Sequence, residues 1–232
     1  GKTRIAFKGD KIQINQARQA SLALGSRSRL VRQLFEILRA GTTQEIRVVF
    51  EHKSLDDLFE ADDMVLRGSV KQGSVKIPKT PVIVSDIDGT AFIQKGVLQV
   101  NAKSGNLAGS RVSQGWLDLD LLNYEDSPFK GEFNFSADLS GVPSTLISLL
   151  PGTVLANELK KIQQVSGRAD TRLILGMDTG EKDIQVDVRA SNISGLALYD
   201  RIPLNLSISN GVFSYKDQQA VLCNVEGRVG NN

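Results

Sequence analysis

Two aspartates that follow an apolar run are the residues best placed to do chemistry. Residues 82–90 read Val-Ile-Val-Ser-Asp-Ile-Asp-Gly-Thr, so one residue separates Asp86 from Asp88. A carboxylate can attack phosphorus when a second carboxylate acts as a general acid and a divalent cation completes the site. This spacing makes phosphoryl transfer the first chemistry to consider.

The Asp-x-Asp-Gly-Thr motif resembles the signature of haloacid-dehalogenase-type phosphatases, which implies a nucleophilic Asp86 and a general acid at Asp88. Two features favour a turn instead. Asp-Gly is a preferred pair in two-residue hairpins, and the segments after Gly89 are too short for the crossover helix of a parallel sheet. We therefore predict a hairpin turn at Asp88-Gly89, no enzymatic activity and no cofactor. A phosphatase is the minor alternative.

The composition leaves few other catalytic groups. The 232 residues include one His and one Cys, so multi-histidine zinc sites and thiolate metal sites are excluded by count. Ser-His-Asp catalysis would have to use His52. We predict no metal site, a surface or half-buried His52, a buried Cys223 and a packing role for Trp116.

Charge is unevenly distributed along the chain. Residues 1–53 contain eleven Lys and Arg against four Asp and Glu, a net charge of +7, whereas the whole chain carries +2. Clustered basic residues can bind an anionic partner, either nucleic acid or phospholipid headgroups, but more often they form a solvated helix face. Aromatic residues that could stack on bases are not interleaved here, so we predict no nucleic-acid partner.

The chain is apolar enough to form a large core. Its apolar fraction is 41% and its net charge is low, which argues against intrinsic disorder. No apolar run approaches the roughly 20 residues that span a bilayer, and residues 1–25 lack the apolar centre of a signal peptide. We expect a soluble protein, or the soluble part of a longer one.

Alternation of apolar and polar residues predicts that most of the chain is β-strand. The pattern is clearest at 132–139, 184–190 and 204–209, and it puts one face of each strand toward apolar material. Shorter stretches of the same kind occur at 12–14, 46–50, 117–121 and 173–177.

Two segments have a period near 3.6 residues and predict amphipathic helices. The first covers 28–40 and ends at Gly41, and the second runs from about 144 to 165 and ends near Gly167. Pro151 should kink or split the second helix. Capping-box spacing of Ser54 and Asp57 favours a short helical turn at 54–60.

A repeat of 122 residues is the strongest feature of the sequence. It places Ile208 and Asn210 where the first copy has Asp86 and Asp88, which again favours a turn. A partial third copy at the start leads us to expect a tail of a preceding unit at 1–25, unit 1 at 26–141 and unit 2 at 142–232, cut from a longer array. The aligned landmarks are Gly73 and Gly195, Pro81 and Pro203, Gly89 and Gly211, and Gly105 and Gly227.

The pattern of strand and turn motifs in each copy resembles the AsmA-like superfamily, the bacterial branch of the repeating-β-groove proteins that includes TamB and YhdP. The resemblance rests on the Pro-led strand into Asp88-Gly89, the Gly-x-Leu-x-Val strand at 96–100, the turn at 105–110 and the Gly-Trp-Leu-Asp-Leu strand at 115–119. It implies a periplasmic, non-catalytic segment of a bridge-like lipid-transfer protein that serves outer-membrane lipid homeostasis. The parent protein would be anchored in the inner membrane and reach the outer membrane through parts outside this chain.

The expected fold is mainly β: an antiparallel, strongly curled repeat sheet, forming an open groove or half-barrel, with about two amphipathic helices packed on it. Such an apolar face either holds a hydrophobic ligand, here phospholipid acyl chains, or is filled by the protein's own helices as an ordinary core. A structural or adhesive β-repeat module is therefore the main alternative to a lipid conduit. The candidate groove residues are Ile46, Val48, Phe50, Phe133, Phe135, Leu173, Leu175, Val186, Val188, Leu204 and Leu206.

Overall fold

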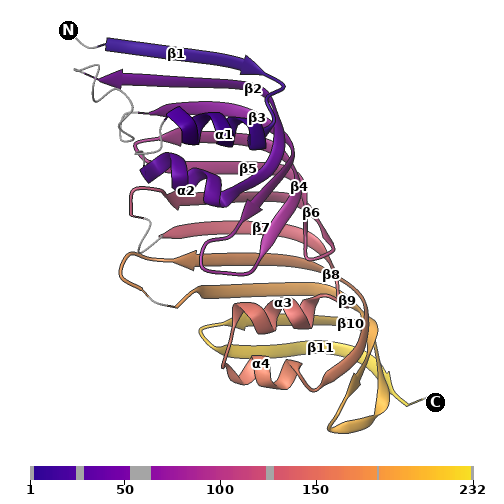
Figure 1. Cartoon of the computed structure of the whole chain (residues 1–232). Coiled ribbons are helices and arrows are strands. Elements are labelled where there is room, and N and C mark those ends of the chain that lie inside the picture. The colour runs from indigo at the N-terminus through magenta and orange to yellow at the C-terminus, as the bar shows by residue number, and fades with distance from the viewer. Residues whose placement is uncertain (1–2, 25–28, 53–63, 124–127, 182, 231–232) are drawn as a thin grey trace.

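A single antiparallel sheet of eleven strands forms the body of the molecule in the computed structural model, which describes residues 3–24, 29–52, 64–123, 128–181 and 183–230. The strands lie side by side in chain order from β1 to β11, and the sheet does not close (Figure 1). The strands are β1 (Thr3–Asp10), β2 (Leu38–His52), β3 (Val65–Lys76), β4 (Ile83–Gln94), β5 (Val97–Leu107), β6 (Ser110–Asp120), β7 (Phe129–Asp138), β8 (Ile162–Met177), β9 (Gln185–Tyr199), β10 (Ile202–Lys216) and β11 (Gln219–Val229).

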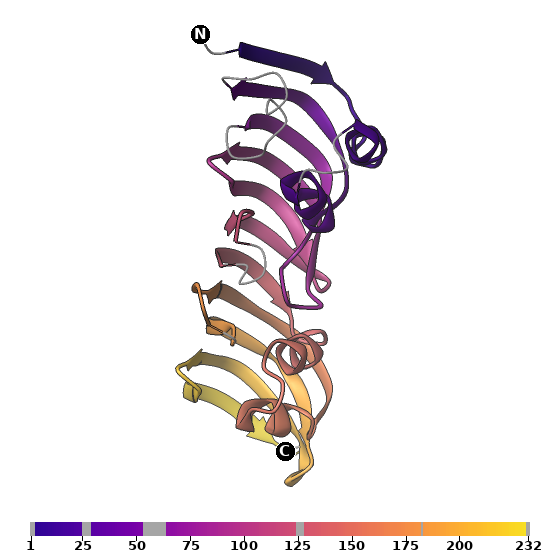
Figure 2. The ribbon, with the colours of Figure 1, turned by 60° about the vertical axis from the view of Figure 1, so that its left-hand side comes forward.

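Two pairs of short helices lie on the same side of this sheet (Figure 1). The first pair, α1 (Ile14–Leu24) and α2 (Arg29–Ile37), connects β1 to β2, and the second pair, α3 (Val142–Leu149) and α4 (Val154–Leu159), connects β7 to β8. Figure 2 shows the strands arching beneath the helices. The mainly β, antiparallel prediction is therefore confirmed.

The helix predictions are right in position and wrong in extent. The segment after Ile37 forms β2, because Leu38 pairs with Val75 of β3, so the helix ends before Gly41. The expected break at Pro151 separates α3 from α4, and Thr153 caps α4 by accepting a hydrogen bond from the Ala156 amide at 3.2 Å. Residues 162–165 belong to β8, and Gly167 lies within that strand rather than at a helix end.

The helix α1 was not predicted from the sequence. The alternation at 12–14 suggested a strand, but α1 begins at Ile14, whose side chain is buried. The chain here makes a single isolated bridge from Gln13 to Thr42 before it turns into the helix. The helical turn expected at 54–60 lies outside the described residues.

The predicted hairpin turn at Asp88-Gly89 is wrong. Both residues lie inside β4, and the equivalent Asn210 and Gly211 lie inside β10. Asp86 has a φ of 52°, and the pairing register shifts between Ser85 and Asp88, as in a β-bulge. Residues that tolerate positive φ serve bulges as well as turns, which is why the motif misled the sequence argument.

The order of elements is the same in the two halves of the chain. A strand, a helix pair and four strands follow one another from β1 to β5, and again from β7 to β11, with β6 between the two sets. A shift of 122 residues carries the bounds of β5 onto those of β11. The unit boundaries at 25/26 and 141/142 stay predictions.

Two single-residue predictions have different outcomes. Cys223 was expected to be buried, but it is exposed because it lies in β11, the last strand of the sheet, where every described side chain is exposed. Trp116 is half-buried in β6, where its position opposite Glu132 places it on the polar side of the sheet. His52 ends β2, and its side chain is outside the described set.

Candidate functional site: the apolar face of the sheet

Apolar residues form continuous rows across the strands on one face of the sheet, which we call the apolar face. Residues directly opposite in antiparallel strands share a face, so the pairing register defines each row. One row, called here the long row, crosses nine strands and contains no charged side chain. At the usual strand spacing, the row is roughly 40 Å long. It consists of Val70, Gly89, Ala102, Gly115, Phe133, Leu173, Val188, Tyr215 and Ala220.

A second row begins at the first strand of the sheet. It contains no charged residue, and Phe7 at its start is 52% exposed and packs edge-on against Phe50, with ring centroids 6.3 Å apart. The apolar face therefore continues to the edge formed by β1. This row consists of Phe7, Val48, Leu66, Ile93, Leu98, Leu119, Phe129 and Met177.

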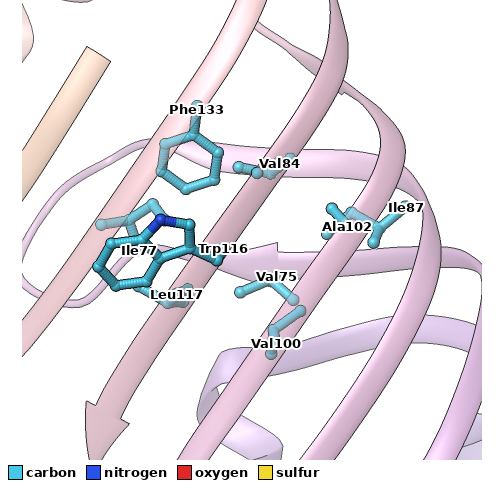
Figure 3. Close-up of a pocket in the computed structure, with 10 residues that line it drawn as sticks. Val75, Ile77, Val84, Ile87, Val100, Ala102, Trp116, Leu117 and Phe133 are labelled. Carbon is cyan, nitrogen blue, oxygen red and sulfur yellow. The ribbon is translucent and has the colours of Figure 1, made fainter. Parts of the chain in front are cut away.

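In the middle of the apolar face, a loop and a helix of the protein cover the sheet. The loop between β3 and β4 folds onto it and buries Ile77 completely, and the loop is held by hydrogen bonds of 3.0 Å from Thr80 Oγ1 to the Ile77 carbonyl and from the Val82 amide to Thr80 Oγ1. Leu34 and Ile37 of α2 join the same core. The space left among Val75, Val84, Ile87 and their neighbours is about 10 Å³, close to the size of one water molecule (Figure 3).

The apolar face over β7–β11 keeps a larger cavity, which we call the α3–α4 cavity. Its volume is about 350 Å³, and apolar cavities of roughly 150 Å³ can already hold a benzene-sized ligand. Its roof is formed by α3 and α4, including Leu146, Leu149 and Leu155. Its floor is a row across β7–β11: Phe135, Thr171, Ala190, Phe213 and Leu222.

A polar cluster ties the roof of the α3–α4 cavity to the sheet. Glu158 of α4 accepts hydrogen bonds from Lys161 Nζ at 2.8 Å, Tyr199 Oη at 2.6 Å and Arg201 Nη2 at 2.7 Å. Hydrogen bonds from Lys161 and Tyr199, together with the charge of Arg201, lower the pKa of Glu158 to about 2, so the carboxylate is ionised at neutral pH. Glu158 is also the one ionisable residue among the described residues that line the cavity.

The predicted groove residues fall into two groups in the structure. Phe133, Leu173, Leu175, Val186 and Val188 are buried on the apolar face and belong to its core. Phe133, Leu173 and Val188 are members of the long row, and the last two also line the α3–α4 cavity.

The remaining groove candidates are more accessible. Phe135 is half-buried and lines the α3–α4 cavity. Ile46, Val48 and Phe50 are half-buried near the first strands, so the structure does not bring them to the cavity. In β10, Leu206 is half-buried, whereas Leu204 is 50% exposed and outside the cavity lining.

Sequence reasoning missed several cavity residues. Ile193, Ile208 and Phe213 line the α3–α4 cavity, but they lie where the strands carry register shifts, so strict alternation does not group them with their neighbours. The helical roof was anticipated only as a possible filling of the groove. The apolar period of 144–165 was the available signal for it.

The two aspartates of the phosphatase-like motif have structural partners. Asp88 Oδ1 accepts a hydrogen bond from the Gln72 amide at 3.2 Å, and the Ser85 hydroxyl donates to Asp86 Oδ2 at 3.3 Å. Asp88 therefore satisfies a backbone donor at the register shift between Val70 and Gly73 of β3. Across the described ranges, no group of three or more His, Cys, Asp or Glu residues could hold a metal ion.

Comparison with known proteins gives no relative: no protein-family model, no curated protein and no solved structure matches the chain. Among the helices that the structure describes, none has the length and apolar character needed to cross a membrane.

Proposed function

We propose that this chain is a non-catalytic segment of an AsmA-like, periplasmic lipid-transfer protein, and that its curled apolar face carries phospholipid acyl chains. The observation that carries the proposal is the long row, which crosses nine strands of the apolar face without a charged side chain. A hydrocarbon chain gains free energy where it covers apolar surface that the protein's own loop and helices leave open, as in the α3–α4 cavity.

The α3–α4 cavity is the part of this face with room for a ligand. Its volume of about 350 Å³ falls within the range of small-molecule sites, and most of its lining is apolar. At β11 its floor ends in Leu222, which is 53% exposed. A chain that enters the cavity could therefore extend along the apolar face toward this edge.

A structural β-repeat module is the second candidate, and the closed middle of the apolar face favours it. Ile77 is fully buried and the pocket beside it measures about 10 Å³, so an acyl chain could pass there only if the loop at 77–82 moved aside. A bound lipid is the property that separates the two candidates.

Photo-crosslinking with a lipid that carries a diazirine in its acyl chain tests the proposal. The lipid is supplied to the purified chain, and crosslinked peptides are mapped by mass spectrometry. We expect labels on residues that line the α3–α4 cavity, such as Phe213 and Leu222. Labels confined to the polar face, or no saturable labelling, would favour the structural module.

A further inference from the structure

The opposite side of the sheet, called here the polar face, carries a hollow that the lipid proposal does not use. This outer hollow has a volume of about 530 Å³ and lies over β6–β9. Its polar lining includes three arginines and several hydrogen-bonding side chains, among them Arg111, Ser113, Asn134, Ser136, Arg172 and Arg189.

The register explains why a hollow forms here. Ser136 and Asn134 of β7 are short side chains, and they pair with Arg111 of β6 and Arg172 of β8 respectively. The long side chains of Arg111 and Arg172 therefore flank the short side chains of β7, which form the floor of the hollow. Arg189 lies one strand further, opposite Arg172 on β9. The strands that carry Arg111 and Arg189 are therefore roughly 14 Å apart, a gap that two long arginine side chains can span when a small group is held between them.

The arginines of the hollow have unequal partners. Arg172 forms a bidentate pair with Glu132, with Nε–Oε1 and Nη2–Oε2 distances of 2.7 and 2.9 Å. Within the part of the chain that the structure describes, the guanidinium groups of Arg111 and Arg189 have no hydrogen-bond or ion-pair partner. Both residues are exposed and available to a ligand.

Two of these arginines repel each other across the strand pair. Arg172 lies directly opposite Arg189, and like charges at opposite positions in an antiparallel pair destabilise the sheet. An anion between them would remove this repulsion. Glu132, through its bidentate pair with Arg172, and the nearby charge of Asp187 offset part of this repulsion.

We propose that the outer hollow binds an oxyanion, such as a phosphate group, between Arg111 and Arg189. Guanidinium groups bind oxyanions through paired, charge-assisted hydrogen bonds, and Ser136 and Asn134 supply further donors from the floor. Arg172, fixed by Glu132, completes the positive rim. The site is on the opposite face from the acyl-chain site and does not depend on it.

One acidic residue on the rim sets a limit on affinity. Asp170 lines the hollow, and its carboxylate accepts a hydrogen bond from Asn192 Nδ2 at 2.8 Å. Its negative charge opposes that of the ligand. Removing this charge should strengthen binding. The effect of an Asp170 variant on affinity should therefore be opposite to that of the arginine variants.

The test is calorimetric titration of the whole chain with inorganic phosphate and, separately, with phosphatidylglycerol vesicles, using phosphatidylcholine vesicles as the uncharged reference. We expect saturable binding that weakens about tenfold in Arg111→Gln or Arg189→Gln and tightens in Asp170→Asn. Arg228→Gln is the matched control, because Arg228 is an exposed arginine of β11 outside the hollow.

Each outcome decides the proposal. Binding of inorganic phosphate that depends on Arg111 and Arg189 supports it with a soluble ligand as the source. Binding of phosphatidylglycerol vesicles alone, with the same dependence, supports it with a lipid headgroup as the source. No saturable binding in either titration, or an equal loss in Arg228→Gln, overturns it.

Discussion

At the scale of single residues, two carboxyl side chains accept hydrogen bonds that fix a backbone amide and a helix. Asp88 accepts the Gln72 amide beside a bulge, and Glu158 joins α4 to the turn between β9 and β10 through Tyr199 and Arg201. The pKa of Tyr199 is raised because its hydroxyl donates to the Glu158 carboxylate. Asp88 thus acts within the sheet, between β3 and β4, whereas Glu158 acts between α4 and the turn after β9.

The Glu158 cluster predicts a pH dependence of stability at acidic pH only. The pKa of Glu158 falls from 4.5 to about 2 on folding, so its ionised form favours the folded state. That contribution is fully present above pH 4.5 and is lost as pH falls toward about 2. The stability difference between the wild type and Glu158→Gln should therefore be constant from pH 5 to 7 and shrink below it, as measured by denaturant unfolding.

Titration of the Glu158 carboxylate by NMR checks the cause. We expect a midpoint near 2 in the wild type and a higher one in Tyr199→Phe, because that variant removes a hydrogen bond to the ionised carboxylate. A wild-type midpoint at 4.5 would show that the cluster does not form in solution.

At the scale of elements, close backbone contacts across the strands explain where glycine recurs. A Cβ at Gly89 would collide with the Asn101 carbonyl of β5, and one at Gly227 with the Ser207 carbonyl of β10. Gly167 of β8 has a φ of 128° and faces Gly195 of β9 at similarly close range. Among the glycines that mark the repeat, Gly89, Gly195 and Gly227 are therefore sites of close strand approach, whereas a Cβ at Gly211 would meet no atom closer than 3.7 Å.

Gly89→Ala should lower the free energy of unfolding by about 2–3 kcal/mol, because the new methyl group meets the backbone of β5 and cannot be accommodated by a side-chain rotation. Gly176→Ala is the matched control. A Cβ there would lie 3.5 Å from the Phe129 carbonyl, an ordinary contact, so its effect should stay within about 1 kcal/mol.

Urea unfolding of the two variants beside the wild type measures this difference. Equal stabilities for Gly89→Ala and Gly176→Ala would mean that residue 89 is not in close contact with β5. That result would contradict the pairing of Gly89 with Ala102.

At the scale of the whole molecule, the same apolar face is a closed core in the middle and a roofed cavity toward β11. The loop at 77–82 and α2 cover the centre, whereas α3 and α4 bridge over the floor row and leave about 350 Å³. The two halves share their order of elements but differ in how completely the helices fill the face. Ligand binding is therefore expected in the second half.

Two substitutions that introduce a carboxylate should have different effects in the closed core and at the α3–α4 cavity. Val186→Glu places a carboxylate at a site that is 7% exposed, so it should lower the free energy of unfolding by 3 kcal/mol or more, or prevent folding. Phe135→Glu lies at the half-buried margin of the α3–α4 cavity and should leave a folded protein that no longer takes up lipid. Circular dichroism and the lipid crosslinking assay measure both properties.

The outcome for Phe135→Glu decides between lipid conduit and structural module. A folded variant without lipid labelling supports the conduit. If this variant unfolds as readily as Val186→Glu, the region around Phe135 is ordinary core. Gln114→Glu, an exposed polar position in β6, controls for the added charge itself.

Alternation and amphipathic periodicity are local properties of a sequence, so they were enough to predict a mainly β, antiparallel fold and the position of two helical segments. The 122-residue period is likewise visible in the sequence alone. The tertiary structure decided whether Asp88-Gly89 turned the chain or continued it, since a residue with positive φ suits both a hairpin and a bulge and only pairing with β3 and β5 selects between them. It also decided which part of the apolar face stayed hollow. That depends on how far two helices and one loop, distant in sequence from the strands they cover, reach across the sheet.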